Sequence, residues 1–381
     1  MRVAIVTSRY PSEENPHVYA FVHIRAKEYI KKGINVDIFV PSKTTMQRHY
    51  DGITVQYLPA PQIPRLLERS DVVMSHLLHI SYQRERDGSH IYEWLLREQW
   101  PFLYFIHGIE VQKIAVARPE RIIWWNPYAI LAYLYHDFYL IPKMRHFLIR
   151  LYNEHPRFQF VAVSRWMLDE VKRNLDLDFT ARAKVIPNGI NTKLFVFKDR
   201  WKDRHRLLTI RPLHMKGKYA LDLALETMRY LSPPITLDIY GSGPDEAKIR
   251  RWIQAHGLNE RIRLTEGFVP HTQLPQIHEG HGIYYAVTRM DAQGVTMCEA
   301  MASGLPVVSF AICGIPEFVH HGKTGILIEP YNVRQAAEAI QRLTEDRDLY
   351  QRLAEGARRF IETIDIERTT EQEIALAQSL L

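Results

Sequence analysis

The chain has 381 residues, of which 46% are hydrophobic and 24% charged, and its formal net charge is +6. This length and composition indicate a globular protein of two domains and exclude a fibrous or disordered chain. The most apolar run, residues 129–135, is too short to cross a bilayer. The chain contains two cysteines and starts without a signal-peptide pattern, so we expect a cytoplasmic protein.

The first half of the chain alternates short apolar runs with longer amphipathic stretches, which is typical of parallel βα units. Apolar residues at helical spacing predict a first helix over residues 19–32, and Gly33 follows as its cap. Functional side chains are expected where the strands end, at the carboxyl edge of an open parallel sheet. The predicted strands are residues 3–8, 35–40, 53–58, 71–75, 101–106 and 159–163.

A second alternating set begins after the basic, polar stretch 197–206. Its predicted strands are residues 207–210, 235–240, 262–265, 283–287, 306–310 and 325–328, and its predicted helices are residues 220–230, 245–256, 272–279, 295–302 and 332–343. The sequence therefore predicts two doubly wound α/β domains, residues 1–195 and 196–365. A final helix over residues 366–381 is expected to pack back on the first domain. A cleft between two such domains is a usual position for a ligand.

Residues 118–150 differ in composition from the rest of the first half, and residues 1–195 carry a net charge of +7 against −1 for the remainder. Aromatic rings with basic flanks suit an element that lies on an anionic membrane, so a peripheral position on the inner face is one interpretation. A helical excursion packed on the first domain is the other, and both remain open. The residues concerned are Trp124, Trp125, Tyr128, Tyr133, Tyr135, Phe138, Tyr139 and Phe147, with Arg118, Arg121, Lys143, Arg145 and Arg150. No nucleic-acid-binding motif accompanies them, so no nucleic-acid partner is expected.

Two basic residues follow the first predicted strand of the second half. Arg211 comes at the end of this strand, and Lys216 lies just before Gly217 and a helix. A guanidinium and an ammonium at a strand-to-helix junction suit a diphosphate, and the start of the helix adds its dipole. A further glycine turn, with Gly241 and Gly243, follows the next strand and is a candidate for the same ligand.

Two carboxylates are spaced by eight residues: Asp291 precedes a glycine turn, and Glu299 lies inside the helix that follows it. Gly294 permits close approach of the backbone to a ligand, and the N–H groups of Val295 and Thr296 point out of the start of the helix. One carboxylate would then accept a hydrogen bond from a sugar hydroxyl and the other from a ribose diol.

Short motifs follow one another in the second half in this order: Pro187-Asn-Gly-Ile-Asn191, Arg211 with Lys216-Gly217, Gly241-Ser-Gly-Pro244, Asp291-x₇-Glu299, Gly304-x-Pro306, Gly314-x-Pro-Glu317 and Gly322-x-Thr-Gly325. This ordered set resembles retaining glycosyltransferases of family 4, which have the GT-B fold of two Rossmann-like domains. The resemblance covers about residues 185–330. The first half matches only in its strand pattern and in Phe105-Ile-His107-Gly108-Ile-Glu110.

The resemblance implies transfer of a sugar from a nucleotide-diphosphate sugar to a glycan or lipid-linked acceptor, as in the synthesis of cell-envelope polysaccharides. It implies that Arg211 and Lys216 hold the donor diphosphate and neutralise the leaving group. Glu299 would bind the ribose. Asp291 and the start of the following helix would hold the transferred sugar, and His107 would face that sugar from the other domain. Fixed cations make a metal dispensable, so neither a metal nor a cofactor beyond the donor is expected.

The sequence departs from the family pattern in several places. Asp291 replaces a glutamate, Gln293 a phenylalanine and Asn191 an aspartate, and the stretch 10–20 stands where a Gly-Gly loop is usual. The changes at 291 and 293 bear on the choice of sugar, and the missing loop bears on the acceptor. Two alternatives to a transferase therefore stay open, namely a nucleotide-sugar epimerase and a non-catalytic nucleotide-sugar-binding subunit.

Overall fold

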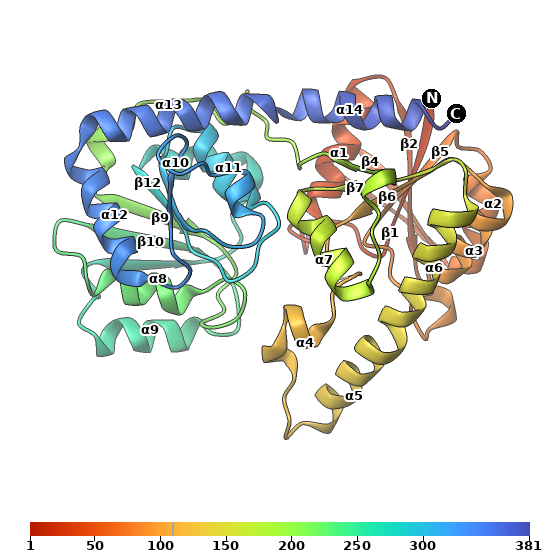
Figure 1. Cartoon of the computed structure of the whole chain (residues 1–381), viewed down its shortest axis with the longest axis horizontal. Coiled ribbons are helices and arrows are strands. Elements are labelled where there is room, and N and C mark those ends of the chain that lie inside the picture. Colours follow the sequence, from red (N-terminus) through yellow and green to blue (C-terminus); the bar gives the residue numbers. More distant parts are fainter. Residues whose placement is uncertain (109) are drawn as a thin grey trace. The chain divides into compact units, whose positions relative to one another are not determined.

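The computed structural model describes residues 1–108 and 110–381, which form two compact units (Figure 1). Unit 1 comprises residues 1–187 and 367–381, and unit 2 comprises residues 188–366. Both are α/β units built on a mostly parallel sheet, as predicted. Unit 2 begins earlier than the predicted boundary after residue 195, because the intervening residues bond to unit 2. The Asn188 N–H donates to Gln293, and the Ile190 N–H donates to the carbonyl of Ile364.

In the described part of unit 1, eight strands form one sheet in the order β3-β4-β2-β1-β5-β6-β7-β8. The central strands are buried on both faces, which explains their continuous apolar sequences. Every neighbouring pair is parallel except β3 and β4. The strands are β1 (Arg2–Thr7), β2 (Asn35–Pro41), β3 (Met46–Tyr50), β4 (Ile53–Leu58), β5 (Val72–His76), β6 (Phe102–Ile106), β7 (Phe158–Ala162) and β8 (Ala183–Val185). Prediction missed the edge strands β3 and β8, whose residues are mostly exposed and therefore lack an apolar pattern.

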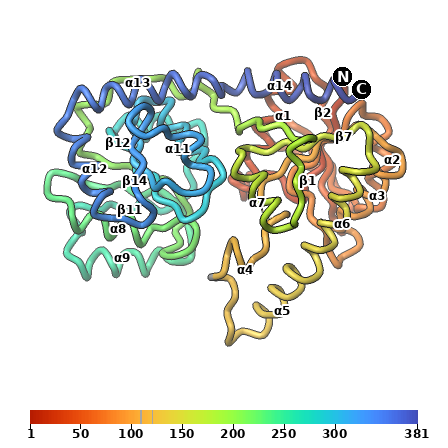
Figure 2. Tube along the Cα trace, viewed as in Figure 1, coloured from red at the N-terminus to blue at the C-terminus, as the bar shows by residue number. Residues whose placement is uncertain are grey.

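The helices of unit 1 are α1 (Ala20–Lys31), α2 (Pro64–Leu67), α3 (Ser89–Glu98), α4 (Ile114–Ala117), α5 (Pro127–Tyr135), α6 (Ile141–Glu154), α7 (Arg165–Leu175) and α14 (Ile366–Gln378). The last helix, α14, lies beside α1, and both ends of the chain lie in unit 1 (Figure 2). Glu373 of α14 is only 1% exposed and accepts hydrogen bonds from Arg25 Nε at 2.9 Å and from the Tyr29 hydroxyl at 2.5 Å. Ala377 and Leu380 join the apolar core of unit 1. The final segment is thus part of unit 1 through buried polar and apolar contacts.

Helices α4 and α5 project from the sheet of unit 1 (Figure 1). Asn126 caps α5, and a π-helical turn, His136–Leu140, continues it into α6. Asp137 in this turn accepts hydrogen bonds from the N–H groups of Ile114 and Ala115 and so joins the start of α4 to the turn between α5 and α6. Trp124 and Trp125 are 70% and 88% exposed, so they lie outside the core.

Two of the basic side chains in residues 118–150, Lys143 and Arg145, contact other parts of unit 1, which the sequence did not predict. Lys143 lies 3.7 Å from Asp87, and Arg145 Nε donates to the carbonyl of Leu175 at 2.5 Å. Phe147 is buried in the core of the unit. Among the helices of the described residues, none is long and apolar enough to cross a membrane.

Unit 2, all of which the structure describes, has a six-stranded parallel sheet in the order β11-β10-β9-β12-β13-β14. Its strands are β9 (Arg206–Ile210), β10 (Thr236–Gly241), β11 (Ile262–Glu266), β12 (Ile283–Ala286), β13 (Val307–Phe310) and β14 (Ile326–Ile328). Its helices are α8 (Leu221–Met228), α9 (Glu246–Ala255), α10 (Leu274–Glu279), α11 (Val295–Ala302), α12 (Val333–Glu345) and α13 (Arg347–Thr363). Two buried apolar clusters pack on the sheet of this unit. The order of strands brings the loops after β9, β10, β12 and β13 to one edge of the sheet.

Candidate functional site

The loops after β9 and β10 lie directly against each other in unit 2. The Leu213 N–H donates to the carbonyl of Ser242 at 2.9 Å. A side chain at position 241 would meet the carbonyl oxygen of Arg211, and one at 243 would lie 2.5 Å from that of Leu213. The glycines at 241 and 243 therefore permit this close packing, a role that the sequence analysis did not assign to them.

Arg211, the first predicted phosphate ligand, joins two of these loops. Its Nη1 donates to the carbonyl of Tyr219 at 2.6 Å and to the carbonyl of Val287 after β12. Its Nε is buried and has no hydrogen-bond partner among the residues that the structure describes. The guanidinium is thus held in place by backbone groups, with donor capacity left over.

Lys216, the second predicted cation, is exposed and forms no ion pair with any described residue. Arg289 holds the loop that carries Lys216. Its Nη1 donates to the carbonyl of Gly217 at 3.1 Å, and the same guanidinium pairs with Asp222. The Thr288 hydroxyl donates to the carbonyl of Lys218 at 2.7 Å. Sequence reasoning missed Arg289, which no motif marks.

The turn before α11 forms around Asp291. Its Oδ1 accepts the N–H groups of Gly294 at 2.9 Å and Gln293 at 3.2 Å, which leaves Oδ2 without a partner among the described residues. Gly294 has φ +72°, a left-handed conformation that favours glycine. The helix begins at Val295, so its first N–H groups, those of Val295 and Thr296, have no acceptor within the helix. Carboxylate and helix start together offer both acceptors and donors to a polar ligand.

Glu299 of α11 is 4% exposed and already has a partner, because it lies 2.8 Å from Nε2 of His271. Burial lowers the pKa of His271, but its hydrogen bond to Glu299 and the charge of that carboxylate outweigh this effect and raise the pKa overall. Sequence reasoning missed His271. A ribose that binds Glu299 must share the carboxylate with this histidine or displace it.

Gln293, which replaces the usual phenylalanine, is 2% exposed and bonds to Asn188 rather than facing outward. Its Oε1 accepts from the Asn188 backbone at 2.8 Å and side chain at 2.7 Å, and its Nε2 donates to the Asn188 carbonyl at 2.8 Å. The substitution therefore ties the loop at 188 to the turn before α11. From its place in the motif, the sequence predicts instead an effect of Gln293 on the choice of sugar.

His107, the remaining predicted site residue, belongs to unit 1 and follows β6. Its N–H donates to Glu110 Oε1 at 2.6 Å, and its Nε2 lies 3.1 Å from Nδ1 of the buried His76. Burial and then the charge of Arg25 hold the pKa of His107 well below its usual range, so the imidazole is neutral at pH 7. Ile109 of the same motif lies outside the described residues.

Within residues 1–108 and 110–381, no group of three or more His, Cys, Asp or Glu side chains could hold a metal ion. The structure brings the predicted residues Arg211, Lys216, Asp291 and Glu299 to one edge of the unit 2 sheet, through loops that bond to one another. His107 belongs to unit 1.

Three comparisons with known proteins bear on this site. Residues 204–360, which lie within unit 2, match the family described as glycosyl transferases, group 1. The chain is 30% identical over 119 residues to the alpha-D-kanosaminyltransferase of Streptomyces kanamyceticus, which is 31% of each chain. It is 28% identical over 186 residues to the GDP-mannose-dependent alpha-(1-6)-phosphatidylinositol monomannoside mannosyltransferase of Mycobacterium tuberculosis, which is 44% of this chain and 48% of that one. The matched segments thus span less than half the length of these curated relatives.

A solved structure is similar over the whole chain. Anabaena HepE in complex with UDP and glucose superposes with a TM-score of 0.71 at 14% identity, and the match covers 100% of both chains. At this identity the likeness establishes the fold. The chain has the GT-B fold. Unit 1 and unit 2 are its two Rossmann-like domains, as the motifs of the second half implied.

Proposed function

We propose that this protein is a glycosyltransferase that moves a sugar from a nucleotide-diphosphate sugar to an acceptor. The observation that carries the proposal is the coincidence of two independent features in unit 2. The segment that matches the family, residues 204–360, contains the interlocked loops that present Arg211, Lys216, Asp291 and Glu299. A nucleoside diphosphate leaves with developing negative charge, and fixed cations at a strand-to-helix junction stabilise it.

We propose the residue roles that the family resemblance implies, and the chemistry of each group agrees with them. Arg211 and Lys216 bind the donor diphosphate, and the loop glycines 241 and 243 keep this backbone close. Glu299 accepts from the ribose diol. Asp291 Oδ2 and the free N–H groups at the start of α11 bind the transferred sugar, and His107 in unit 1 supplies a neutral donor or acceptor to the same sugar.

The direct test is calorimetric titration of UDP, GDP, ADP and dTDP into the full chain. UDP and GDP are the first choices, because HepE was solved with UDP and the mycobacterial relative is named as GDP-mannose-dependent. One nucleotide should bind tightly, and Lys216→Ala should weaken it, whereas the exposed Lys248→Ala of the same unit should not. Lack of binding to every nucleotide would contradict the proposal.

Turnover then separates the transferase from its alternatives. Incubation with the preferred nucleotide sugar should release nucleoside diphosphate only when an acceptor, or water in its place, takes the sugar. Conversion of the donor to a different nucleotide sugar without an acceptor would indicate an epimerase. Tight donor binding without turnover on any glycan or lipid-linked acceptor would indicate a binding subunit.

We further propose that transfer retains the anomeric configuration and needs no metal, on the basis of the family resemblance and the two cations. Proton NMR of the product should show the same anomer as the donor. Activity should survive EDTA. A loss of activity that Mn²⁺ or Mg²⁺ restores would overturn metal independence and leave the transferase assignment in place.

We also propose that the protein works at the cytoplasmic face of a membrane, through the excursion of α4 and α5, on acceptors of envelope glycan synthesis. Trp124, Trp125 and Tyr128 are more than two-thirds exposed and lie near the exposed Arg121. Aromatic rings insert at the headgroup level of a bilayer. Flotation with phosphatidylglycerol vesicles should show binding that Trp124→Ala/Trp125→Ala removes. The exposed Val196→Ser in unit 2 should leave binding unchanged, and an equal loss in this control would contradict the proposal.

A further inference from the structure

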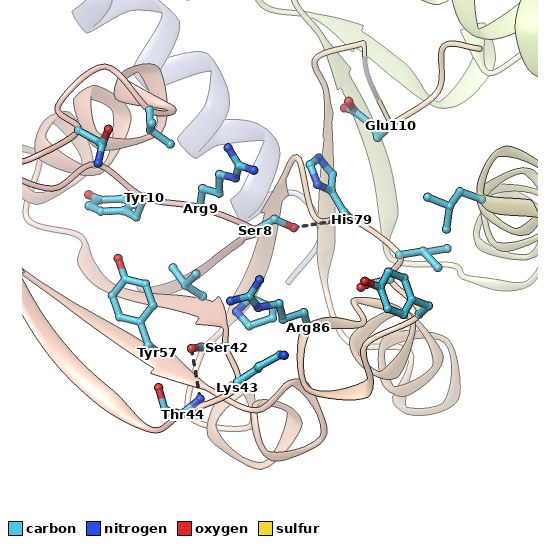
Figure 3. Close-up of a pocket in the computed structure, with 18 of the residues that line it drawn as sticks. Ser8, Arg9, Tyr10, Ser42, Lys43, Thr44, Tyr57, His79, Arg86 and Glu110 are labelled. Atoms are coloured by element: carbon cyan, nitrogen blue, oxygen red, sulfur yellow. Dashed lines mark hydrogen bonds between the residues drawn. The ribbon is translucent and has the colours of Figure 1, made fainter. Parts of the chain in front are cut away.

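Unit 1 contains a cavity of about 800 Å³ at the carboxyl edge of its own sheet (Figure 3). Its walls come from the loops after β1, β2 and β5, and from the helical turn around residue 136 and the loop after β6. Every lining residue belongs to unit 1. The stretch 10–20, which stands where the family pattern has glycines, supplies part of the wall.

Four cations line this cavity: Arg9 follows β1, Lys43 follows β2, Arg48 lies in β3, and Arg86 lies in the helical turn Arg84–Arg86 after β5. Figure 3 shows Arg9, Lys43 and Arg86 around the cavity. None of the four forms an ion pair with any residue of the part of the chain that the structure describes. Elsewhere in unit 1, cations such as Arg2 and Lys27 pair with carboxylates at 3.2 and 2.9 Å. The cavity therefore concentrates positive charge that the fold does not neutralise.

The acid among the lining residues does little to offset this charge. Glu110 is 5% exposed, and burial raises the pKa of its carboxyl to about 7, so a large fraction of it is protonated near neutral pH. Burial and then the charge of Arg9 lower the pKa of His79 to about 4, so this imidazole is neutral.

Buried polar atoms at the cavity lack partners. His79 Nε2 and Glu110 Oε2 have no hydrogen-bond partner among the described residues, although both are inaccessible to bulk solvent as they stand. The His79 backbone N–H is fixed by the Ser8 hydroxyl at 2.8 Å. A buried polar atom without a partner is unfavourable by about 1–3 kcal/mol, and a polar ligand in the cavity that reached these atoms would remove this cost.

The remaining lining suits a phosphorylated ligand. Hydroxyls of Ser8, Ser42 and Ser81 stand among the cations, and the Arg48 guanidinium lies 5.6 Å from the centre of the Tyr57 ring. Arginine, lysine and hydroxyl groups together are the donors that bind phosphate oxygens in charge-assisted hydrogen bonds. The chemistry of the walls is thus that of a phosphate site with an aromatic side.

We propose that this cavity binds the acceptor through a phosphate group, held by Arg9, Lys43, Arg48 and Arg86, with the acceptor's polar end toward His79 and Glu110. The identity of the phosphorylated ligand as the acceptor rests on the proposed function. The phosphate site itself depends on unit 1 alone. The phosphate belongs either to a small phosphomonoester or to the phosphodiester of a lipid headgroup.

The test measures phosphate binding to the full chain in a Lys216→Ala background, which weakens the donor diphosphate site. Inorganic phosphate and glycerol 3-phosphate should raise the melting temperature more than sodium chloride of equal ionic strength, and glycerol should not. Lys43→Ala and Arg86→Ala should each weaken the binding of these anions about tenfold. Arg65→Ala and Arg69→Ala, exposed cations of unit 1 outside the cavity, should leave it unchanged. The proposal would be overturned if phosphate binding did not depend on the cavity cations. It would also be overturned if neither inorganic phosphate, glycerol 3-phosphate nor vesicles bound.

The second arm identifies the source of the phosphate. In a Trp124→Ala/Trp125→Ala background, vesicle binding that still requires Lys43 and Arg86 indicates a lipid phosphodiester, whereas vesicle binding that does not depend on them, with glycerol 3-phosphate still bound, indicates a phosphomonoester. Either result supports the cavity as a phosphate site. If nucleotides fail to bind unit 2 but the cavity cations still bind phosphate, the proposed function fails and the site stands. If nucleotides bind unit 2 but the cavity cations bind no phosphate, the phosphate site is refuted and the proposed transferase function stands.

Discussion

The two units present charged groups at the carboxyl edges of their sheets in opposite ways. In unit 2, Arg211, Asp291 and Glu299 already bond to the backbone or to His271, and they come from short motifs within one segment. In unit 1, four cations line a cavity and form no ion pair with any described residue. Apart from the exposed Lys216, the unit 2 site thus has groups that are held in place before a ligand binds, whereas the unit 1 cavity carries charge that only a ligand would neutralise.

The comparison also concerns how each unit completes its core. Unit 2 is continuous in sequence, whereas unit 1 recruits α14 from the far end of the chain through Glu373 and the apolar residues around it. The stability of unit 1 therefore depends on a segment that is more than 150 residues away in sequence from the rest of that unit, as the bounds 187 and 367 imply.

The largest expected effect tests this dependence. Glu373→Ala should lower the free energy of unfolding by about 3–5 kcal/mol, because it leaves Arg25 charged and buried and removes the acceptor of the Tyr29 hydroxyl. Denaturant unfolding followed by circular dichroism measures it. Glu371→Ala, also in α14, removes an exposed pair with Lys32 at the end of α1 and should leave the midpoint unchanged. Equal effects of the two variants would show that α14 does not stabilise unit 1 in this way.

The next effect tests the site of unit 2. Lys216→Ala should lower turnover by about 10²–10³-fold with the fold intact, because the leaving diphosphate loses a fixed cation. Arg211→Ala should do the same but also lower the melting temperature, since its guanidinium joins the loops after β9 and β12. Steady-state kinetics with thermal melts distinguishes the two. Near-normal turnover in Lys216→Ala would place the diphosphate elsewhere, and the control Lys248→Ala should match the unmodified chain.

A smaller effect tests the buried acid of unit 1 through pH. Burial raises the pKa of Glu110 from its ordinary 4.5 to about 7 in the folded chain. The folded protein keeps this proton where the unfolded chain has lost it, so the free energy of unfolding falls as the pH rises from 4.5 to 7 and then levels off. The contribution is on the order of 1–3 kcal/mol. Glu110→Gln should flatten this part of the stability profile, and an unchanged profile would contradict the raised pKa.

The smallest expected effect separates the two carboxylates of unit 2. Glu299→Gln should weaken binding of the nucleoside diphosphate about tenfold, because a neutral amide is a poorer acceptor for the ribose diol. Asp291→Asn should spare that affinity and lower transfer, because its partner is the sugar. Calorimetry with the nucleotide alone decides between them. Equal losses of nucleotide affinity in both variants would refute this division of roles.

Much of the site in unit 2 could be predicted from the sequence, because a loop that binds a diphosphate needs particular residue types at short spacing. Arg211, Asp291 and Gly294 are recognisable for that reason. The supporting contacts of the site were not predictable, since His271 bonds to Glu299 and Arg289 bonds to the carbonyl of Gly217 from positions that no motif marks. Gln293 was assigned to the sugar from its place in a motif, yet its amide bonds to Asn188.

The amino-acid pattern by itself determined the two α/β units, most of their buried strands and the motif residues. Apolar periodicity, and the glycines that let the backbone approach a ligand, can be recognised within a few residues of sequence. The fold alone decided the cavity of unit 1, the exposure of Trp124 and Trp125, and the pairing of α14 with α1. Those features depend on contacts between segments that lie far apart in the chain, and parallel strands bring such segments together only at the edge of the finished sheet.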